Sequence, residues 1–238
     1  MKKVQFSVGK DKLIGHLFTP KVIRKKHKSV LIVHGWTSNQ NRGFHLARAL
    51  VKKGYIVMTF DMRGHGVSDR KLEDLSRKDF LNDVVSAYDF LARSTGVDQN
   101  NIIAIGSSFG GYMVTLLSAK RKIKALVMRV PANYKDEGFT HQYKITQKKK
   151  ASEAWKNKLH KNTATKSLRA LHVFKGNVLI VESGKDELVP SGMVQSYVKA
   201  VTSKKKLTYK IMESATHSIS QHPTFQRQFR DLVLNWLK

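Results

Sequence analysis

Two kinds of hydrophobic pattern alternate along the chain. Near the N-terminus, residues 4–7 and 14–18 alternate apolar and polar side chains around Gly9-Lys10-Asp11-Lys12, which is typical of an antiparallel hairpin at one edge of a sheet. Further on, short apolar runs rich in β-branched residues predict strands buried on both faces of a parallel sheet. These strands are expected at Val30–Val33, Tyr55–Phe60, Ile102–Ile105, Ala125–Val130 and Val178–Val181, with a further strand at Leu207–Met212.

Between these strands, apolar side chains recur at helical spacing. Helices are expected at Phe44–Lys53, Phe80–Arg93, Tyr112–Lys120, Met193–Val201 and Phe225–Leu237. Strands that alternate with helices indicate right-handed crossovers and a mostly parallel sheet covered on both faces. The pattern therefore predicts a single α/β domain over residues 1–238.

One segment interrupts the alternation. Between Pro131 and Lys175 no clear strand is visible, and the basic, weakly amphipathic run at 151–160 indicates inserted helices. We interpret residues 131–175 as a small basic cap.

Composition narrows the class of protein. The chain has 238 residues, 41% of them hydrophobic, which is enough to bury a sizeable core and argues against disorder. No stretch approaches the roughly 20 apolar residues that cross a bilayer, and no apolar signal segment follows Met1, so a cytoplasmic location is expected. The absence of cysteine excludes disulfides, thiolate metal sites and a cysteine nucleophile.

The charge is strongly positive, with 44 Lys and Arg against 17 Asp and Glu, a formal net charge of +27. The electrostatic field of so many positive charges predicts weak, salt-sensitive association with polyanions. The basic runs at 24–28, 120–122, 148–150 and 204–206 are scattered, however, which favours solvated faces, and no nucleic-acid-binding motif is present. Lysines of the expected cap, Lys148 to Lys150 among them, would favour anionic or amphiphilic substrates if they face a pocket.

The run Gly106-Ser107-Ser108-Phe109-Gly110 has the form Gly-x-Ser-x-Gly and stands between an expected strand and an expected helix. In such a turn the serine adopts a strained backbone conformation, and glycines flank it because strand and helix cross closely. Ser108 is therefore the predicted nucleophile. Ser107 is the positional alternative, but only Ser108 is centred between the glycines.

A serine hydroxyl needs a base, and the base needs an acid that holds its tautomer. Asp186 follows the strand at 178–181 and is the candidate acid. The neighbouring Glu187 is the alternative acid. The competing structural role for Asp186 is to cap the helix that follows. His217 follows the strand at 207–212 and is the candidate base, ahead of His222. The chain order Ser, Asp, His is the one expected of this kind of fold.

The same chemistry needs backbone N–H groups that stabilise the charge on the carbonyl oxygen. The expected donors are the N–H of Phe109 and that of Trp36, in the His34-Gly35-Trp36 run after the strand at 30–33. His34-Gly35 could instead be only a strand-ending turn.

Together with Asp61-Met62-Arg63-Gly64-His65-Gly66-Val67-Ser68, these motifs resemble the α/β-hydrolase superfamily over nearly the whole chain. They are most similar to the small bacterial esterases that include cinnamoyl and feruloyl esterases, and to the serine aminopeptidase-like and monoacylglycerol-lipase-like group. The resemblance implies Ser108 as nucleophile, Asp186 as acid, His217 as base, and Trp36 and Phe109 as oxyanion donors. It also implies that Arg63 and His65 shape the loop beside the site.

The leading hypothesis is a serine esterase that cleaves small carboxylic esters through an acyl-enzyme on Ser108, with no metal and no cofactor. Thioesterase, lipase and peptidase activities use the same groups and remain alternatives. A hypothesis of a different class is a non-catalytic basic protein that binds nucleic acid or an anionic membrane on this scaffold.

Overall fold

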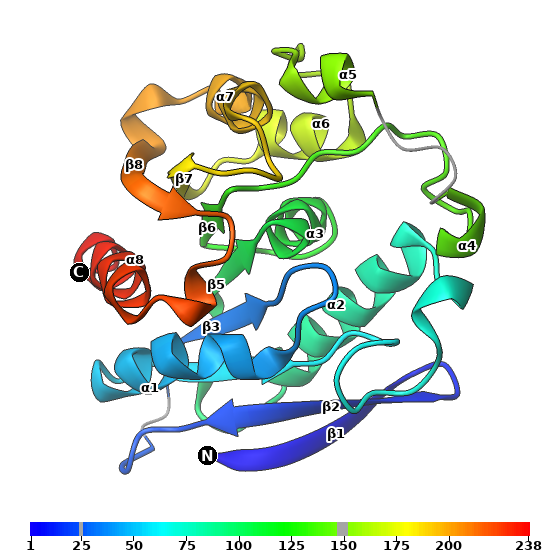
Figure 1. Ribbon diagram of the computed structural model, residues 1–238. Coiled ribbons are helices and arrows are strands. Elements are labelled where there is room, and N and C mark those ends of the chain that lie inside the picture. The colour runs from blue at the N-terminus through cyan, green and yellow to red at the C-terminus, as the bar shows by residue number, and fades with distance from the viewer. Residues whose placement is uncertain (24–25, 147–151) are drawn as a thin grey trace.

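Within the described residues, eight strands form one sheet through the centre of the molecule (Figure 1). The computed structural model describes residues 1–23, 26–146 and 152–238. The strands are β1 (Lys2–Val8), β2 (Asp11–Phe18), β3 (His27–Val33), β4 (Ile56–Phe60), β5 (Val97–Ser107), β6 (Ala125–Arg129), β7 (Asn177–Lys185) and β8 (Leu207–Thr216). Their spatial order is β1-β2-β4-β3-β5-β6-β7-β8. The hairpin β1–β2 is antiparallel and joins β4 in antiparallel register, whereas β3 to β8 are parallel, which confirms the predicted sheet.

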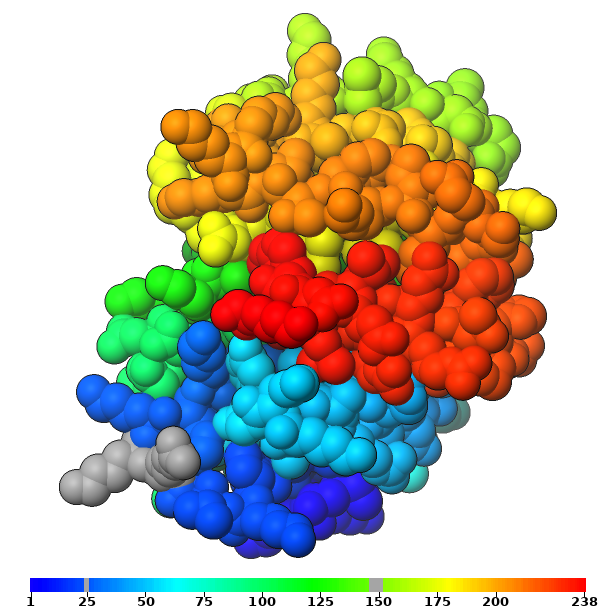
Figure 2. All heavy atoms as spheres, turned by 90° about the vertical axis from the view of Figure 1, so that its left-hand side faces the viewer, coloured from blue at the N-terminus to red at the C-terminus, as the bar shows by residue number. Residues whose placement is uncertain are grey.

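Helices cover both faces of this sheet (Figure 1). They are α1 (Phe44–Lys52), α2 (Arg77–Ala92), α3 (Phe109–Ser118), α4 (Tyr143–Thr146), α5 (Glu153–Asn157), α6 (Lys166–Val173), α7 (Ser191–Ala200) and α8 (Pro223–Trp236). One core lies between the sheet and α2, α3, α6 and α7, and a second lies between the sheet and α1 and α8. Figure 2 shows α8 beside α1 on this second face. None of the described helices is both long and apolar enough to span a membrane.

Two helices begin three residues earlier than predicted. α2 begins at Arg77 instead of Phe80 because Ser76 and Asp79 form a capping box: the Ser76 hydroxyl accepts the Asp79 N–H at 3.2 Å, and the Asp79 carboxylate accepts the Ser76 N–H at 2.9 Å. α3 begins at Phe109 instead of Tyr112, directly after the Ser108 turn. In both places the polar or glycine-rich first turn hides the helical pattern of apolar residues.

The segment interpreted as a cap contains α4, α5 and α6. α6 packs against α3 and α7, and its Leu168 and Leu171 are buried in the first core. Two lysines of the segment have carboxylate partners: Lys144 contacts Asp74 at 2.8 Å, and Lys156 contacts Glu153 at 2.6 Å. Lys148 to Lys150, like Arg24 and Lys25, lie outside the described residues.

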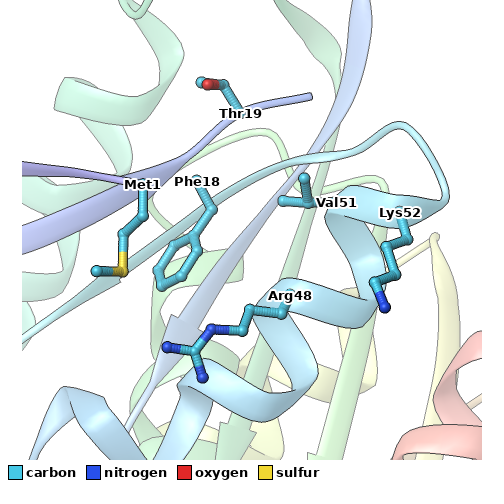
Figure 3. Close-up of a pocket in the computed structure, with 6 residues that line it drawn as sticks. All are labelled: Met1, Phe18, Thr19, Arg48, Val51 and Lys52. Carbon is cyan, nitrogen blue, oxygen red and sulfur yellow. The ribbon is translucent and has the colours of Figure 1, made fainter. Parts of the chain in front are cut away.

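A shallow hollow of about 340 Å³ lies beside α1 (Figure 3). The residues that line it are Met1, Phe18, Thr19, Arg48, Val51 and Lys52. Phe18 is in register with Val57 at the amino end of β4. The hollow is therefore at the end of the parallel strands opposite to the candidate site, which lies at their carboxyl ends.

Candidate active site

Ser108 occupies the turn between β5 and α3 with φ 54° and ψ −118°, a conformation that L-residues rarely adopt. The neighbouring glycines make this turn possible. A Cβ on Gly110 would lie 2.2 Å from the Val33 carbonyl oxygen, and one on Gly106 would lie 2.2 Å from the Gly110 carbonyl oxygen. Strand and helix therefore cross too closely for any side chain at these positions, and Ser108 itself stays partly exposed.

The end of β6 and the residues just after it hold Ser108 from both sides. The Ser108 N–H donates to the Arg129 carbonyl at 2.9 Å, and the Ala132 N–H donates to the Ser108 carbonyl at 3.1 Å. Val130, between these two residues, has φ 41°, a costly value for a β-branched residue. The strained turn at Val130 lets residues 129 and 132 bracket the predicted nucleophile.

Asp186 and His217 meet as predicted. The His217 Nδ1 lies 2.9 and 3.0 Å from the two carboxylate oxygens of Asp186. The Leu188 and Val189 N–H groups donate to the same carboxylate at 2.9 and 2.7 Å. Burial opposes ionisation of Asp186, but the hydrogen bonds from His217 and Val189 more than offset it and hold the pKa of this carboxyl below its usual value.

The alternatives to this pair take other places. Asp186 makes no cap for α7, whose N-cap residue is Pro190. The Glu187 carboxylate accepts the backbone N–H of His217 at 3.1 Å and does not bond the ring. The ring of His222 packs against Phe225, with 5.7 Å between ring centroids.

The link between Ser108 and His217 runs through Arg129. In the part of the chain that the structure describes, no hydrogen bond joins the Ser108 hydroxyl to the His217 ring. The Arg129 carbonyl accepts the Ser108 N–H, and its guanidinium donates to the His217 carbonyl at 2.7 Å. The motifs carry no signal for Arg129, because its role depends on how distant loops meet.

The loop after β3 lies against the Ser108 turn. A Cβ on Gly35 would be 3.3 Å from the Ser107 carbonyl oxygen, and the rings of Trp36 and Phe109 pack with centroids 4.9 Å apart. Neither the Trp36 N–H nor the Phe109 N–H has an acceptor among the described residues. The two expected oxyanion donors therefore border the same turn with their N–H groups unengaged.

Two histidines, His34 and His65, support this loop; their ring centroids lie 4.9 Å apart and their planes are tilted by 57°. His34 bonds the Gly35 carbonyl through Nδ1 at 2.8 Å and accepts the Met62 N–H at Nε2. His65 Nε2 accepts the Thr37 N–H at 3.3 Å. Burial, together with the neighbouring His65, lowers the pKa of His34 to about 4, and burial lowers the pKa of His65 as well. Both rings are therefore neutral at neutral pH and can accept these N–H groups.

The loop at 61–68 is anchored by buried charge. Asp61 accepts the backbone and side-chain N–H groups of Gln40, both at 2.8 Å. Arg63 forms ion pairs with Asp83 at 2.6 Å and with Asp11 at 2.8 Å. These contacts suit the supporting role that the resemblance gave to this loop.

Comparisons with known protein families match residues 24–170, more than half of the chain, to the family described as serine aminopeptidase, S33. A carboxylesterase of Bacillus subtilis is 33% identical over 127 residues, which are 52% of this chain and 50% of that protein. The matched stretch thus spans about half the length of that relative.

Solved structures share the whole fold. One is Est1E from Butyrivibrio proteoclasticus with ferulic acid bound, which has a TM-score of 0.75 and 23% identity over 98% of both chains. Another is an alpha-beta serine hydrolase homologue from Coxiella burnetii, with a TM-score of 0.71 and 19% identity over 100% of this chain and 97% of that one. At these identities the likeness concerns the fold alone.

Proposed function

The chain belongs to the serine aminopeptidase S33 family of α/β-hydrolases, and from this premise we propose that it cleaves carboxylic esters through an acyl-enzyme on Ser108. The observation that carries the proposal is the Asp186–His217 hydrogen-bonded pair beside the strained Ser108 turn. A strained turn persists only where the surrounding structure holds it, and such strain is concentrated at functional sites.

The reaction follows from the roles of these groups. Because Asp186 accepts the Nδ1–H of His217, the Nε2 lone pair of the ring is free to take the Ser108 proton as Oγ attacks the acyl carbon. His217 then gives that proton to the leaving alkoxide. Water, activated by the same ring, releases the acid. A serine–histidine hydrogen bond often tightens only when substrate is bound, so its absence within the described residues is compatible with this mechanism.

Two backbone groups stabilise the tetrahedral intermediate. The Trp36 and Phe109 N–H groups border the Ser108 turn and lack acceptors among the described residues, so they are available to the developing oxyanion. By analogy with measured deletions of such donors, each contributes about 3 kcal/mol of transition-state stabilisation. His34 and His65 keep the loop that presents Trp36 in place.

Esters are favoured over other acyl compounds because a relative that shares 33% identity over half of the chain is a carboxylesterase. The description of the matching family favours a peptidase as the second candidate.

We propose small, anionic or amphiphilic esters as substrates, given the net charge of +27. A panel of p-nitrophenyl esters, thioesters and aminoacyl p-nitroanilides separates these activities by kcat/KM.

Ser108→Ala tests the nucleophile, and Ser107→Ala is the matched control one residue away. With a short-chain p-nitrophenyl ester, Ser108→Ala should lower kcat by about 10⁴-fold or more, as expected when a nucleophile of this kind is removed. Ser107→Ala should retain most of the wild-type turnover. Unchanged turnover in pure Ser108→Ala protein would exclude Ser108 as nucleophile.

A further inference from the structure

Arg129 is the last residue of β6 and lies between the strand of the predicted nucleophile and the strand of the predicted acid. It is in register with Ser107 of β5 and Val181 of β7. Side chains two residues apart share a face of a sheet, and Val127 belongs to the core beneath α1 and α8. The Arg129 side chain therefore lies on that face, below the loop between β8 and α8 that carries His217.

Arg129 contacts all three parts of the candidate site. Its carbonyl accepts the Ser108 N–H at 2.9 Å. Its guanidinium donates to the His217 carbonyl at 2.7 Å and to the Ser183 hydroxyl, on the strand that leads to Asp186, at 3.1 Å. A planar guanidinium can make both bonds at once, because its donors are fixed in a fork.

Packing alone does not explain why a charged side chain, Arg129, occupies this buried position. The residue is only 5% exposed, and within the described ranges no carboxylate forms a salt bridge with it. Arg63, also buried, is by contrast paired with Asp11 and Asp83. Burial lowers the pKa of Arg129 to about 10, against the opposing influence of Asp186 and Glu187, so the group stays charged at neutral pH. An apolar side chain of similar size would avoid this desolvation cost.

We propose that Arg129 is a positioning residue for the acyl-transfer reaction: it fixes the backbone of His217 so that the ring stands between Asp186 and the Ser108 hydroxyl. The inference rests on the proposed function. Three anchors then act on one residue, because Asp186 holds the His217 ring, Glu187 its N–H and Arg129 its carbonyl. Among the described residues, these three are the charged side chains that hydrogen-bond His217, and Arg129 is the positively charged one.

The test compares Arg129→Met and Arg129→Lys with Arg121→Met, a control that removes an arginine paired with Asp89 away from the site. With a short-chain p-nitrophenyl ester, Arg129→Met should lose about 10²-fold in kcat, the scale expected of a small misplacement, with KM little changed. Arg129→Lys keeps the charge but not the fork, so its kcat should also fall, with KM again little changed. Arg121→Met should match the wild type in both kcat and KM.

Each outcome of these measurements either supports or overturns the positioning role of Arg129. Wild-type kcat in folded Arg129→Met, or a loss of kcat/KM that comes mainly from a raised KM, overturns the proposal. If circular dichroism shows that Arg129→Met does not fold, Arg129→Lys decides instead, and wild-type kcat in that folded variant overturns the proposal. Failure of the proposed function has a different signature, because the wild type itself would then neither hydrolyse the ester nor react with a fluorophosphonate probe.

Discussion

At the scale of single residues, the site depends on groups that hold His217 and Asp186 in place. The order of Ser108, Asp186 and His217 along the chain predicts which residues meet, and the structure brings Asp186 and His217 together. Glu187 and Arg129 could not be predicted as partners of His217, since they bond its backbone N–H and carbonyl. Such contacts depend on loop conformation and leave no pattern of residue types in the sequence.

Asp186→Asn should lower kcat by about 10³- to 10⁴-fold, because an amide nitrogen in place of one oxygen favours the wrong tautomer of His217. Glu187→Gln is the matched control: its amide oxygen can still accept the His217 N–H, so most activity should remain. Steady-state kinetics on a p-nitrophenyl ester measures both variants. Equal losses in the two would contradict the assignment of Asp186 as the acid.

At the scale of elements, the junction of β5 and α3 combines strand, strained turn and helix within a few residues. The motif predicts the turn correctly, whereas α3 begins three residues before the predicted start, because Phe109, Gly110 and Gly111 do not show the helical pattern. The strained turn at Val130 was not predicted either. Its φ follows from the bonds that residues 129 and 132 make to Ser108, which join segments distant in the sequence.

Gly110→Ala should destabilise the protein, although alanine is normally more favourable than glycine in a helix. Alanine in a helix interior is normally about 1 kcal/mol more favourable than glycine. Here the new Cβ would lie 2.2 Å from the Val33 carbonyl oxygen, so we expect a loss of about 2 kcal/mol or more in the free energy of unfolding, together with loss of turnover. Urea denaturation and ester hydrolysis measure the two effects.

Gly9→Ala is the control for this substitution. Gly9 has φ 57° but open space around its Cβ position, so backbone strain alone should cost about 1 kcal/mol and activity should persist. If Gly110→Ala were as stable and as active as the wild type, the close crossing of strand and helix would not be required.

At the scale of the whole molecule, the buried parallel strands were predictable because continuous β-branched runs distinguish them, as in β3 and β7. The sequence of residues 131–175 indicates less clearly which helices it forms and where they pack. α6 buries Leu168 and Leu171, but its short apolar stripe stands among basic residues and does not identify it as a helix of the main layer. The net charge of +27 is also a property of the whole molecule and bears on its stability.

Self-repulsion among so many like charges opposes the compact state. Raising NaCl from about 0.01 M to about 0.15 M shortens the screening length from about 30 to about 8 Å, so Tm should rise. For a chain of this size, each kcal/mol gained should raise Tm by about 2 to 4 °C. Differential scanning calorimetry measures the change, and KCl should give the same increase. A constant or falling Tm would mean that the fixed charges are already balanced locally.

The central claim is that Ser108 is the nucleophile. Its most direct measurement is peptide mass spectrometry after reaction of the native protein with a fluorophosphonate probe. We expect one adduct, on Ser108, formed in parallel with loss of ester hydrolysis and missing in Ser108→Ala. An adduct on a different residue, or none while the ester is still hydrolysed, would contradict the account.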